Sequence, residues 1–211
     1  MNKIIWIFWL QGREQAPNIV KKCMESWEEK NPNWSIRLLD EKNVSRYIEL
    51  PDLSSKKITC TSFSNILRVF LLKEYGGVWV DATLYCNKSL DDWLDPYMKH
   101  GFFAFNKPAP NCSLTTWFLA CEENNHIVAH WCNKILKYWS TRDASNTDFL
   151  LQELFASLLE ENVSCRASWN KATKISADLS YAIQSVGMFE TDKKLIESRI
   201  DWQIPVFKLT S

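Results

Sequence analysis

Residues 61–86 read TSFSNILRVFLLKEYGGVWVDATLYC, and this stretch decides the fold. In its first half, apolar side chains recur at the spacing of one helical face: Phe63, Ile66, Leu67, Phe70 and Leu71. Thr61 or Ser62 can cap the start of this helix, and the glycines at 76 and 77 can end it. From Val78 to Cys86 the side chains alternate with the period of two that a strand requires. The stretch therefore predicts a helix that leads directly into a strand.

Polar side chains within this stretch need partners. Asn65 and Arg68 lie three apart on one face of a mostly apolar helix, and a buried guanidinium must find anions. Asp81 shares a strand face with Trp79 and Thr83. A polar helix face followed by a carboxylate on a strand is typical of a site for an anion, or for a metal with its anionic ligand. The alternative is an Arg68–Asp81 salt bridge at an ordinary strand end, and these residues alone favour neither.

The N-terminal part of the chain predicts a strand, a helix and a second strand. Lys3–Leu10 is a continuous apolar run of strand length, as expected in a parallel sheet that is covered on both faces. A helical stripe follows over residues 17–27, and Trp34–Leu39 predicts the second strand. This order is typical of a parallel crossover unit, which the strand from Val78 extends. We therefore expect an α/β protein.

Beyond residue 86 the pattern predicts further strands and helices. The strands are expected over Phe102–Phe105 and Leu114–Cys121, and amphipathic helices over Ile127–Trp139 and Phe149–Leu159. No internal repeat, low-complexity segment or linker divides the sequence, so we expect one domain over residues 1–211.

Charge and cysteine usage disfavour several classes of protein. Lys plus Arg equals Asp plus Glu at 25 each, so nothing indicates a polyanionic partner such as nucleic acid. The seven cysteines are scattered and never form a C-x-x-C pair, which is typical of reduced thiols in a cytoplasmic protein. The longest apolar run, Ile4 to Leu10, is far too short to cross a bilayer. We therefore expect a soluble cytoplasmic protein.

The absence of several sequence motifs disfavours the enzyme classes that depend on them. A G-x-G-x-x-G loop does not follow the first strand, where only Gly12 stands, so a Rossmann-type dehydrogenase is disfavoured. The sequence also has no Walker A loop, G-x-S-x-G elbow or H-E-x-x-H helix. Open α/β sheets bind ligands at the carboxyl ends of their strands, and Asp81 is expected at such an end.

The stretch SNILRVFLLKEYGGVWVDATLYC, residues 64–86, resembles the block of GT-A sugar transferases that carries their Asp-x-Asp motif. In particular it is similar to the capsular polysaccharide synthesis glycosyltransferases. The likeness continues at residues 3–27, 115–128, 147–155 and 205–210, so it covers nearly the whole chain. It implies an α/β GT-A (Rossmann-like) fold with a mixed, mostly parallel sheet flanked by helices. Residues 1–86 would form the nucleotide-binding half, and residues 87–211 the sugar and acceptor half.

The resemblance implies a donor site at the end of the first strand and on the central helix. Phe8 and Trp9 would hold the nucleobase, with the Trp9 ring as a stacking surface, and Gln11 would be a further donor-binding residue. Asn65 and Arg68 would contact the ribose, diphosphate or sugar of the donor. Arg68 is also expected to be catalytic, because a guanidinium stabilises the charge that develops on a departing diphosphate.

The resemblance also implies a metal and sugar site. Asp81 and Thr83 would hold Mn²⁺ or Mg²⁺ against the diphosphate, since two oxygen ligands on one strand face suit a hard divalent ion. Trp117 and Asp148 would line the sugar pocket, and Lys208 would reach a phosphate. Asp81 and Asp148 are expected to be catalytic, the latter by binding sugar hydroxyls or assisting proton transfer. Helix capping is the alternative for Asp148.

Departures from the family pattern remove acidic or metal-binding groups from this site. Thr83 replaces the second aspartate of the motif, Asn65 stands where a relative often has Asp, and Phe207 stands where some carry a metal-binding His. The implied activity is transfer from a nucleotide sugar, UDP-linked, with retained anomeric configuration. The acceptor would be a saccharide or lipid-linked saccharide of a capsule, O-antigen or lipopolysaccharide, reached by peripheral contact with the inner membrane face. The alternative is a catalytically degenerate module that binds nucleotide sugars or glycans.

Overall fold

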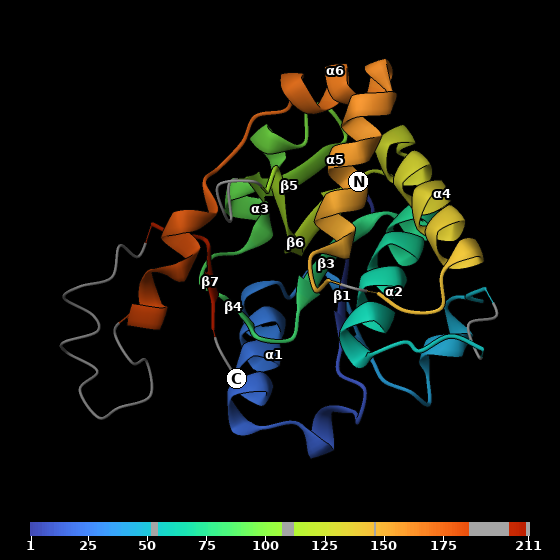
Figure 1. The fold of residues 1–211 in the computed structure, drawn as a ribbon. Helices are drawn as coiled ribbons and strands as arrows, with labels where there is room; N and C mark the ends of the chain where they lie inside the picture. The colour runs from blue at the N-terminus through green and yellow to red at the C-terminus, as the bar shows by residue number, and fades with distance from the viewer. Residues whose placement is uncertain (52–54, 107–111, 146, 186–202, 210–211) are drawn as a thin grey trace.

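The computed structural model describes residues 1–51, 55–106, 112–145, 147–185 and 203–209. Its centre is a five-stranded sheet in the order β2-β1-β3-β6-β5, with helices on both faces (Figure 1). The strands are β1 (Ile4–Phe8), β2 (Ser35–Leu39), β3 (Gly77–Asp81), β5 (Phe102–Asn106) and β6 (Leu114–Cys121). A separate two-stranded sheet pairs β4 (Leu84–Cys86) with β7 (Val206–Lys208).

Strand direction confirms the expected mixed sheet. β1 pairs in parallel with both β2 and β3, whereas β6 pairs antiparallel with both β3 and β5. β6 alone therefore runs against the other four strands, and two of the four strand pairings are parallel. The sheet also takes strands from both halves of the chain, since β1, β2 and β3 precede residue 86 and β5 and β6 follow it.

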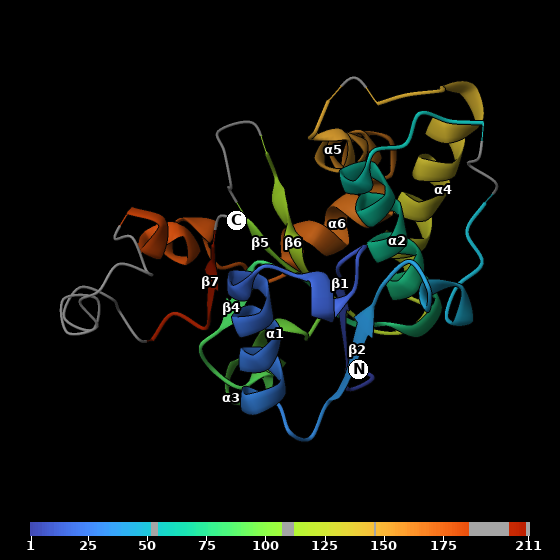
Figure 2. The ribbon, with the colours of Figure 1, turned by 90° about the horizontal axis from the view of Figure 1, so that it is seen from below.

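The helices divide between the two faces of the sheet (Figure 2). α1 (Asn18–Lys30) and α3 (Leu90–Trp93) pack on one face, where Ile5 and Ile7 of β1 point. The other face carries α2 (Cys60–Tyr75), α4 (His126–Thr141), α5 (Leu150–Glu161) and α6 (Val163–Lys171). Trp6 and Phe8 belong to that second core. This alternation along one strand explains why residues 3–10 read as a continuous apolar run.

Helix α2 starts two or three residues earlier than the sequence predicted. Thr59 is its N-cap, in an extended conformation, and its Oγ1 accepts a hydrogen bond from the backbone N–H of Ser62 at 3.0 Å. Thr61 and Ser62 already lie inside the helix, so the prediction that one of them caps it is wrong. The three candidates are close in sequence, and only the backbone conformation distinguishes the cap from the first turn.

The turn from α2 into β3 requires glycine. Gly76 and Gly77 have φ angles of 63° and 88°, in the region that favours glycine. A Cβ on Gly77 would lie 2.6 Å from the carbonyl oxygen of Ile4, so a side chain there would collide with β1. The glycine pair therefore lets α2 end directly beside the first strand and sets the position of β3 against it.

The prediction of a single strand from Val78 to Cys86 is wrong, because the strand ends at Asp81 and a second one begins at Leu84. β1 pairs with β3 only as far as Phe8 opposite Asp81, and β6 pairs only as far as Val80. Ala82 and Thr83 form a turn, and β4 then pairs with β7 instead. Asp81 thus stands at the carboxyl end of a parallel strand, as expected, but Thr83 lies in the turn that follows.

The remaining expectations for the C-terminal part are largely confirmed. α4, α5, β5 and β6 match their expected segments within a few residues. α6 and a 3-10 segment, η4 (Ala177–Ser185), were not predicted. Position 210, at the end of the family-like stretch 205–210, lies outside the described residues. No helix in the described ranges combines the length and apolar character that a membrane span needs.

Candidate active site

A pocket of about 290 Å³ opens at the carboxyl ends of β1 and β3. Its walls come from three segments: residues 8–11 at the end of β1, the first turns of α2, and residues 81–83 at the end of β3. The contributions of α2 are Cys60, Thr61, Ser64 and Arg68. The edge of the sheet that the sequence indicated is therefore hollowed, and the central helix points its N-terminus and its arginine at the hollow.

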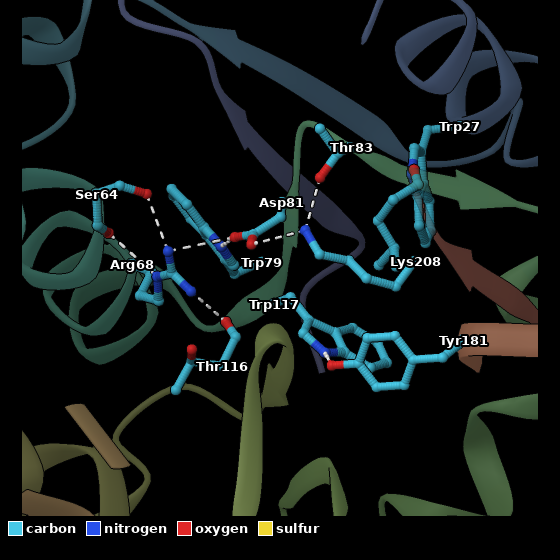
Figure 3. A network of polar contacts seen from close by, with 11 residues as sticks. Trp27, Ser64, Arg68, Trp79, Asp81, Thr83, Thr116, Trp117, Tyr181 and Lys208 are labelled. Atoms are coloured by element: carbon cyan, nitrogen blue, oxygen red, sulfur yellow. Dashed lines mark hydrogen bonds and ion pairs between the residues drawn. The ribbon is translucent and has the colours of Figure 1, made fainter. Parts of the chain in front are cut away.

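Asp81 is the centre of a network of charged groups on the pocket wall (Figure 3). Its Oδ1 lies 3.2 Å from Nη2 of Arg68 and accepts a hydrogen bond from Nε1 of Trp79 at 3.1 Å. Its Oδ2 lies 3.4 Å from Nζ of Lys208. Burial by itself raises the pKa of the Asp81 carboxyl, but these two cations and the hydrogen bonds outweigh it, so the pKa lies below its ordinary value. Asp81 is therefore a carboxylate at neutral pH.

Arg68 is held in one orientation by several contacts. Its side chain is only 5% exposed. Nε donates to the backbone oxygen of Ser64 at 3.2 Å, Nη2 donates to the Ser64 hydroxyl at 3.0 Å, and Nη1 donates to the carbonyl of Thr116. The guanidinium also lies over the Trp79 ring, 5.0 Å from its centroid. Burial lowers the pKa of Arg68 and the adjacent Asp81 carboxylate raises it, and a guanidinium paired with a carboxylate stays charged.

The salt bridge between Arg68 and Asp81 is thus present, and both of its members line the pocket. The salt bridge that one interpretation expected is present, and because it lines a hollow it leaves the other interpretation, a ligand site, as a prediction. A buried ion pair satisfies the helix arginine, and the same pair forms part of a ligand-sized hollow.

Lys208 reaches this network from the far end of the chain. It lies opposite Leu84 in the β4–β7 pair, and the N–H of Leu209 donates to the carbonyl of Thr83 at 3.0 Å. The Nζ of Lys208 donates to Oγ1 of Thr83 at 2.6 Å, in addition to its contact with Asp81. The Lys208 ammonium therefore lies between the two residues that were expected to hold a metal ion.

The side chains at this position do not fit a resident Mn²⁺ or Mg²⁺. Such ions require several oxygen ligands, with negative charge among them. Here one carboxylate is already shared by a guanidinium and an ammonium, and the Thr83 hydroxyl is neutral and accepts from the same ammonium. Within the described ranges, no group of three or more His, Cys, Asp or Glu side chains could hold a metal ion. Phe207, at the position of a metal-binding His in some relatives, is fully buried.

The residues expected at the nucleobase lie together at the mouth of the pocket. Phe8, Trp9 and Gln11 all line it. Phe8 is buried against Phe63, with ring centroids 5.6 Å apart, so it supports the floor rather than offering a free face. Trp9 is half-buried, and its indole N–H has no hydrogen-bond partner in the part of the chain that the structure describes.

Trp117 is buried on β6 and lies beside the network. It contacts Tyr181, a residue that the sequence did not indicate. Its Nε1 donates to the hydroxyl of Tyr181 in η4 at 2.8 Å (Figure 3). Burial raises the pKa of Tyr181, and the nearby Asp81 charge adds to this, so the phenol keeps its proton. Ser64, one turn before Arg68 in α2, is a second residue that was missed. Its helical spacing could have indicated it, whereas Tyr181 comes from a tail with no clear pattern.

Four of the expected site residues are absent from the pocket lining in the described ranges: Asn65, Trp117, Asp148 and Lys208. Lys208 and Trp117 still lie in or beside the Asp81 network, whereas Asn65 and Asp148 do not. Asn65 is buried on α2 and is absent from the pocket lining within the described ranges. Asp148 is exposed in the turn before α5, away from that lining. In that turn the hydroxyl of Thr147 accepts from the N–H of Phe149 at 3.0 Å, and the N-cap residue of α5 is Phe149 rather than Asp148.

Comparison with known proteins identifies the family. A family model described as capsular polysaccharide synthesis protein matches residues 1–211. The chain belongs to this family. Two curated relatives are the O-glycosyltransferase braB of Annulohypoxylon truncatum and the glycosyltransferase afumC of Aspergillus fumigatus. The first is 27% identical over 160 residues, 65% of this chain and 38% of the relative, and the second is 27% identical over 180 residues, 76% and 41%.

This member of the capsular polysaccharide synthesis family thus spans about two fifths of the length of the curated relatives that it matches. Two solved structures share its fold. PaToxG glycosyltransferase has a TM-score of 0.53 at 14% identity, over 96% of this chain and 86% of that one. GlyE of Streptococcus pneumoniae TIGR4 has a TM-score of 0.57 at 11% identity, over 100% and 55%. These likenesses confirm the expected glycosyltransferase fold of the GT-A type.

Proposed function

We propose that this chain is the sugar-transferring part of a glycosyltransferase that uses a nucleotide-sugar donor, UDP-linked, and a surface-glycan acceptor. The observation that carries the proposal is the pocket at the carboxyl ends of β1 and β3, whose wall holds Arg68 and Asp81, with Lys208 bound to Asp81 beside it. Membership in a capsular polysaccharide synthesis family and relatives named as glycosyltransferases support it.

The donor would lie along the pocket from the end of β1 to β6. Its base would stack on the Trp9 ring, where Gln11 offers hydrogen bonds. Its diphosphate would lie against Arg68 and Lys208, which exceed the charge of Asp81 by one positive charge. Its sugar would lie toward Trp117 and Tyr181, whose phenol can donate to a sugar oxygen.

The charged residues would act on the leaving group. Transfer breaks the bond between the sugar C1 and the diphosphate oxygen and forms a bond from C1 to an acceptor hydroxyl oxygen. The diphosphate leaves with the bonding electrons, and its developing charge is stabilised by cations that are already held in place. We propose retention of configuration, because Asp81, the carboxylate of the described pocket lining, is bound by two cations and is a poor base. The acceptor proton would then pass to a leaving phosphate oxygen.

The acceptor is proposed from the family description. A capsule, O-antigen or lipopolysaccharide precursor can be a lipid-linked saccharide, and the chain would then contact the inner face of the membrane from the cytoplasm. Asp148 is exposed beside α5 and could contact such an acceptor rather than the donor.

A panel of UDP-, GDP- and CMP-sugars tests this function. We expect slow hydrolysis of one donor, and its loss in Asp81→Asn, which keeps the shape of the side chain but frees both cations. The exposed Asp178→Asn is the matched control and is expected to retain turnover. Turnover that is unchanged in Asp81→Asn would contradict the assignment.

A nucleotide-sugar or glycan-binding module without turnover is the second candidate. Two observations favour it: Thr83 is neutral where a carboxylate was expected, and two cations already neutralise Asp81. Tight binding of one donor without hydrolysis, and without transfer to saccharide acceptors, would support this module instead of the enzyme.

A further inference from the structure

The contact between Lys208 and the Asp81–Thr83 pair has a consequence for how a diphosphate is bound. The ammonium donates to Thr83 Oγ1 at 2.6 Å and lies 3.4 Å from Asp81 Oδ2. These are the two oxygen ligands that a divalent ion would need at this position. A fixed positive charge of the protein therefore occupies the place of the ion.

The position of Lys208 is built into the fold. Its strand β7 pairs with β4, and on either side of it Phe207 and Leu209 are buried in a small apolar cluster with Cys23 and Ile204. The Lys208 side chain is only 19% exposed. From the other side, Trp27 of α1 donates its indole N–H to the carbonyl of Leu84, the register partner of Lys208, at 2.7 Å. The ammonium is therefore directed at the network by packed elements on both sides.

Charge balance opposes a divalent ion in the same place. Arg68 and Lys208 already exceed Asp81 by one positive charge, and both lie within 3.4 Å of its carboxylate oxygens. A divalent ion would have to displace Lys208 from Asp81 and Thr83 and then remain beside the buried Arg68. Like charges at such distances in a partly buried site repel strongly.

We propose that Lys208 replaces the divalent cation of this site, so that the chain binds a nucleoside diphosphate without a metal ion. Asp81 and Thr83 act as positioning residues that hold the ammonium, and Lys208 and Arg68 neutralise the diphosphate. The inference rests on the proposed function only in that the ligand is a nucleotide.

Two binding measurements test the inference without relying on turnover. Mn²⁺ alone, titrated by electron paramagnetic resonance, is expected to show no stoichiometric site. UDP, GDP, ADP and CDP, titrated by calorimetry, are expected to include one ligand whose Kd changes by less than about twofold between Mn²⁺ and a chelator. A stoichiometric Mn²⁺ site, or nucleotide binding that chelator abolishes, would overturn the inference and leave the proposed function intact. Failure of all four nucleotides in both conditions would overturn both.

Variants at Lys208 identify the group responsible. Lys208→Met is expected to weaken nucleotide binding about tenfold or more, because a charge-assisted contact is lost. Lys208→Arg keeps the charge and is expected to restore most of the affinity, which separates the role of the charge from a folding defect. Lys171→Met, at an exposed position in α6, is the matched control and is expected to bind as the wild type does. Equal affinity in Lys208→Met and wild type would contradict the proposal.

Discussion

At the scale of single residues, the pocket depends on one carboxylate that two cations share. Arg68 and Asp81 come from the family-like stretch and their pairing was one of two interpretations that the sequence allowed. The contact of Lys208 with both Asp81 and Thr83 could not be derived, because Lys208 lies 127 residues from Asp81 and reaches it only through the β4–β7 pair. Tyr181 was missed because η4 follows no clear sequence pattern.

Removing Arg68 tests how much the ion pair contributes to stability. We expect Arg68→Met to lower the free energy of unfolding by about 2–4 kcal/mol, because it leaves Asp81 with one cation and Ser64 and Thr116 without their donor. The loss of unfolding free energy is not expected to be larger, because the Asp81 side chain is 26% exposed and solvent screens its charge. The measurement is urea unfolding, with the exposed Arg37→Met as the matched control. A loss no greater than that of the control would contradict this account of the pair.

The pKa of Asp81 gives stability a defined pH dependence. Because its pKa in the folded chain lies below the ordinary 3.8, the stabilisation is fully present above that ordinary value and is lost as pH falls through the folded pKa. We expect the difference in unfolding free energy between wild type and Asp81→Asn to be constant from about pH 7 to pH 5 and to shrink below about pH 4. A difference that grows on acidification would show that the Asp81 pKa is raised.

At the scale of elements, local signals were sufficient for the helix and the start of β3 but not for the end of β3. The helical stripe and the glycine pair predicted α2 and its exit correctly. The break after Asp81 depends on where β1 and β6 stop pairing, which is a property of two distant segments. The alternating pattern of residues 78–86 continues across the break, so periodicity alone could not reveal it.

Two glycines with positive φ angles, Gly77 in the α2–β3 turn and Gly12 outside it, test why that turn requires glycine. Gly77→Ala is expected to cost about 2–5 kcal/mol, because its Cβ would lie 2.6 Å from the Ile4 backbone oxygen. Gly12→Ala, at φ 80°, meets only the Asp40 side chain at 3.2 Å and is expected to cost about 1–2 kcal/mol from backbone strain. Urea unfolding measures both. Equal losses of unfolding free energy in the two variants would mean that the close approach of Gly77 to the Ile4 backbone contributes nothing to stability.

At the scale of the whole molecule, the sheet joins the two expected halves. β3 from residues 1–86 pairs directly with β6 from residues 87–211, and the pocket network draws Asp81 from one half and Lys208 from the other. The resemblance predicted the fold class correctly, because the family likeness runs over most of the chain. It could not predict the ammonium at the metal position, since that depends on how this chain departs from the family pattern.

The shared sheet predicts cooperative unfolding. We expect a single thermal transition in which tryptophan fluorescence and far-UV circular dichroism coincide, because the β3–β6 and β4–β7 pairs join the two halves. A chain of residues 1–86 alone is expected to lack a cooperative transition. Two separate transitions in the full chain would show that the halves are independent domains.

The measurement that tests the central claim most directly is a crystal structure with bound UDP, grown in chelator. We expect the diphosphate in the pocket between α2 and β7, with a phosphate oxygen within about 3.5 Å of Lys208 Nζ and the base against Trp9. UDP bound elsewhere on the molecule, or bound here only after Mn²⁺ is added and with Lys208 displaced from Asp81, would contradict the account.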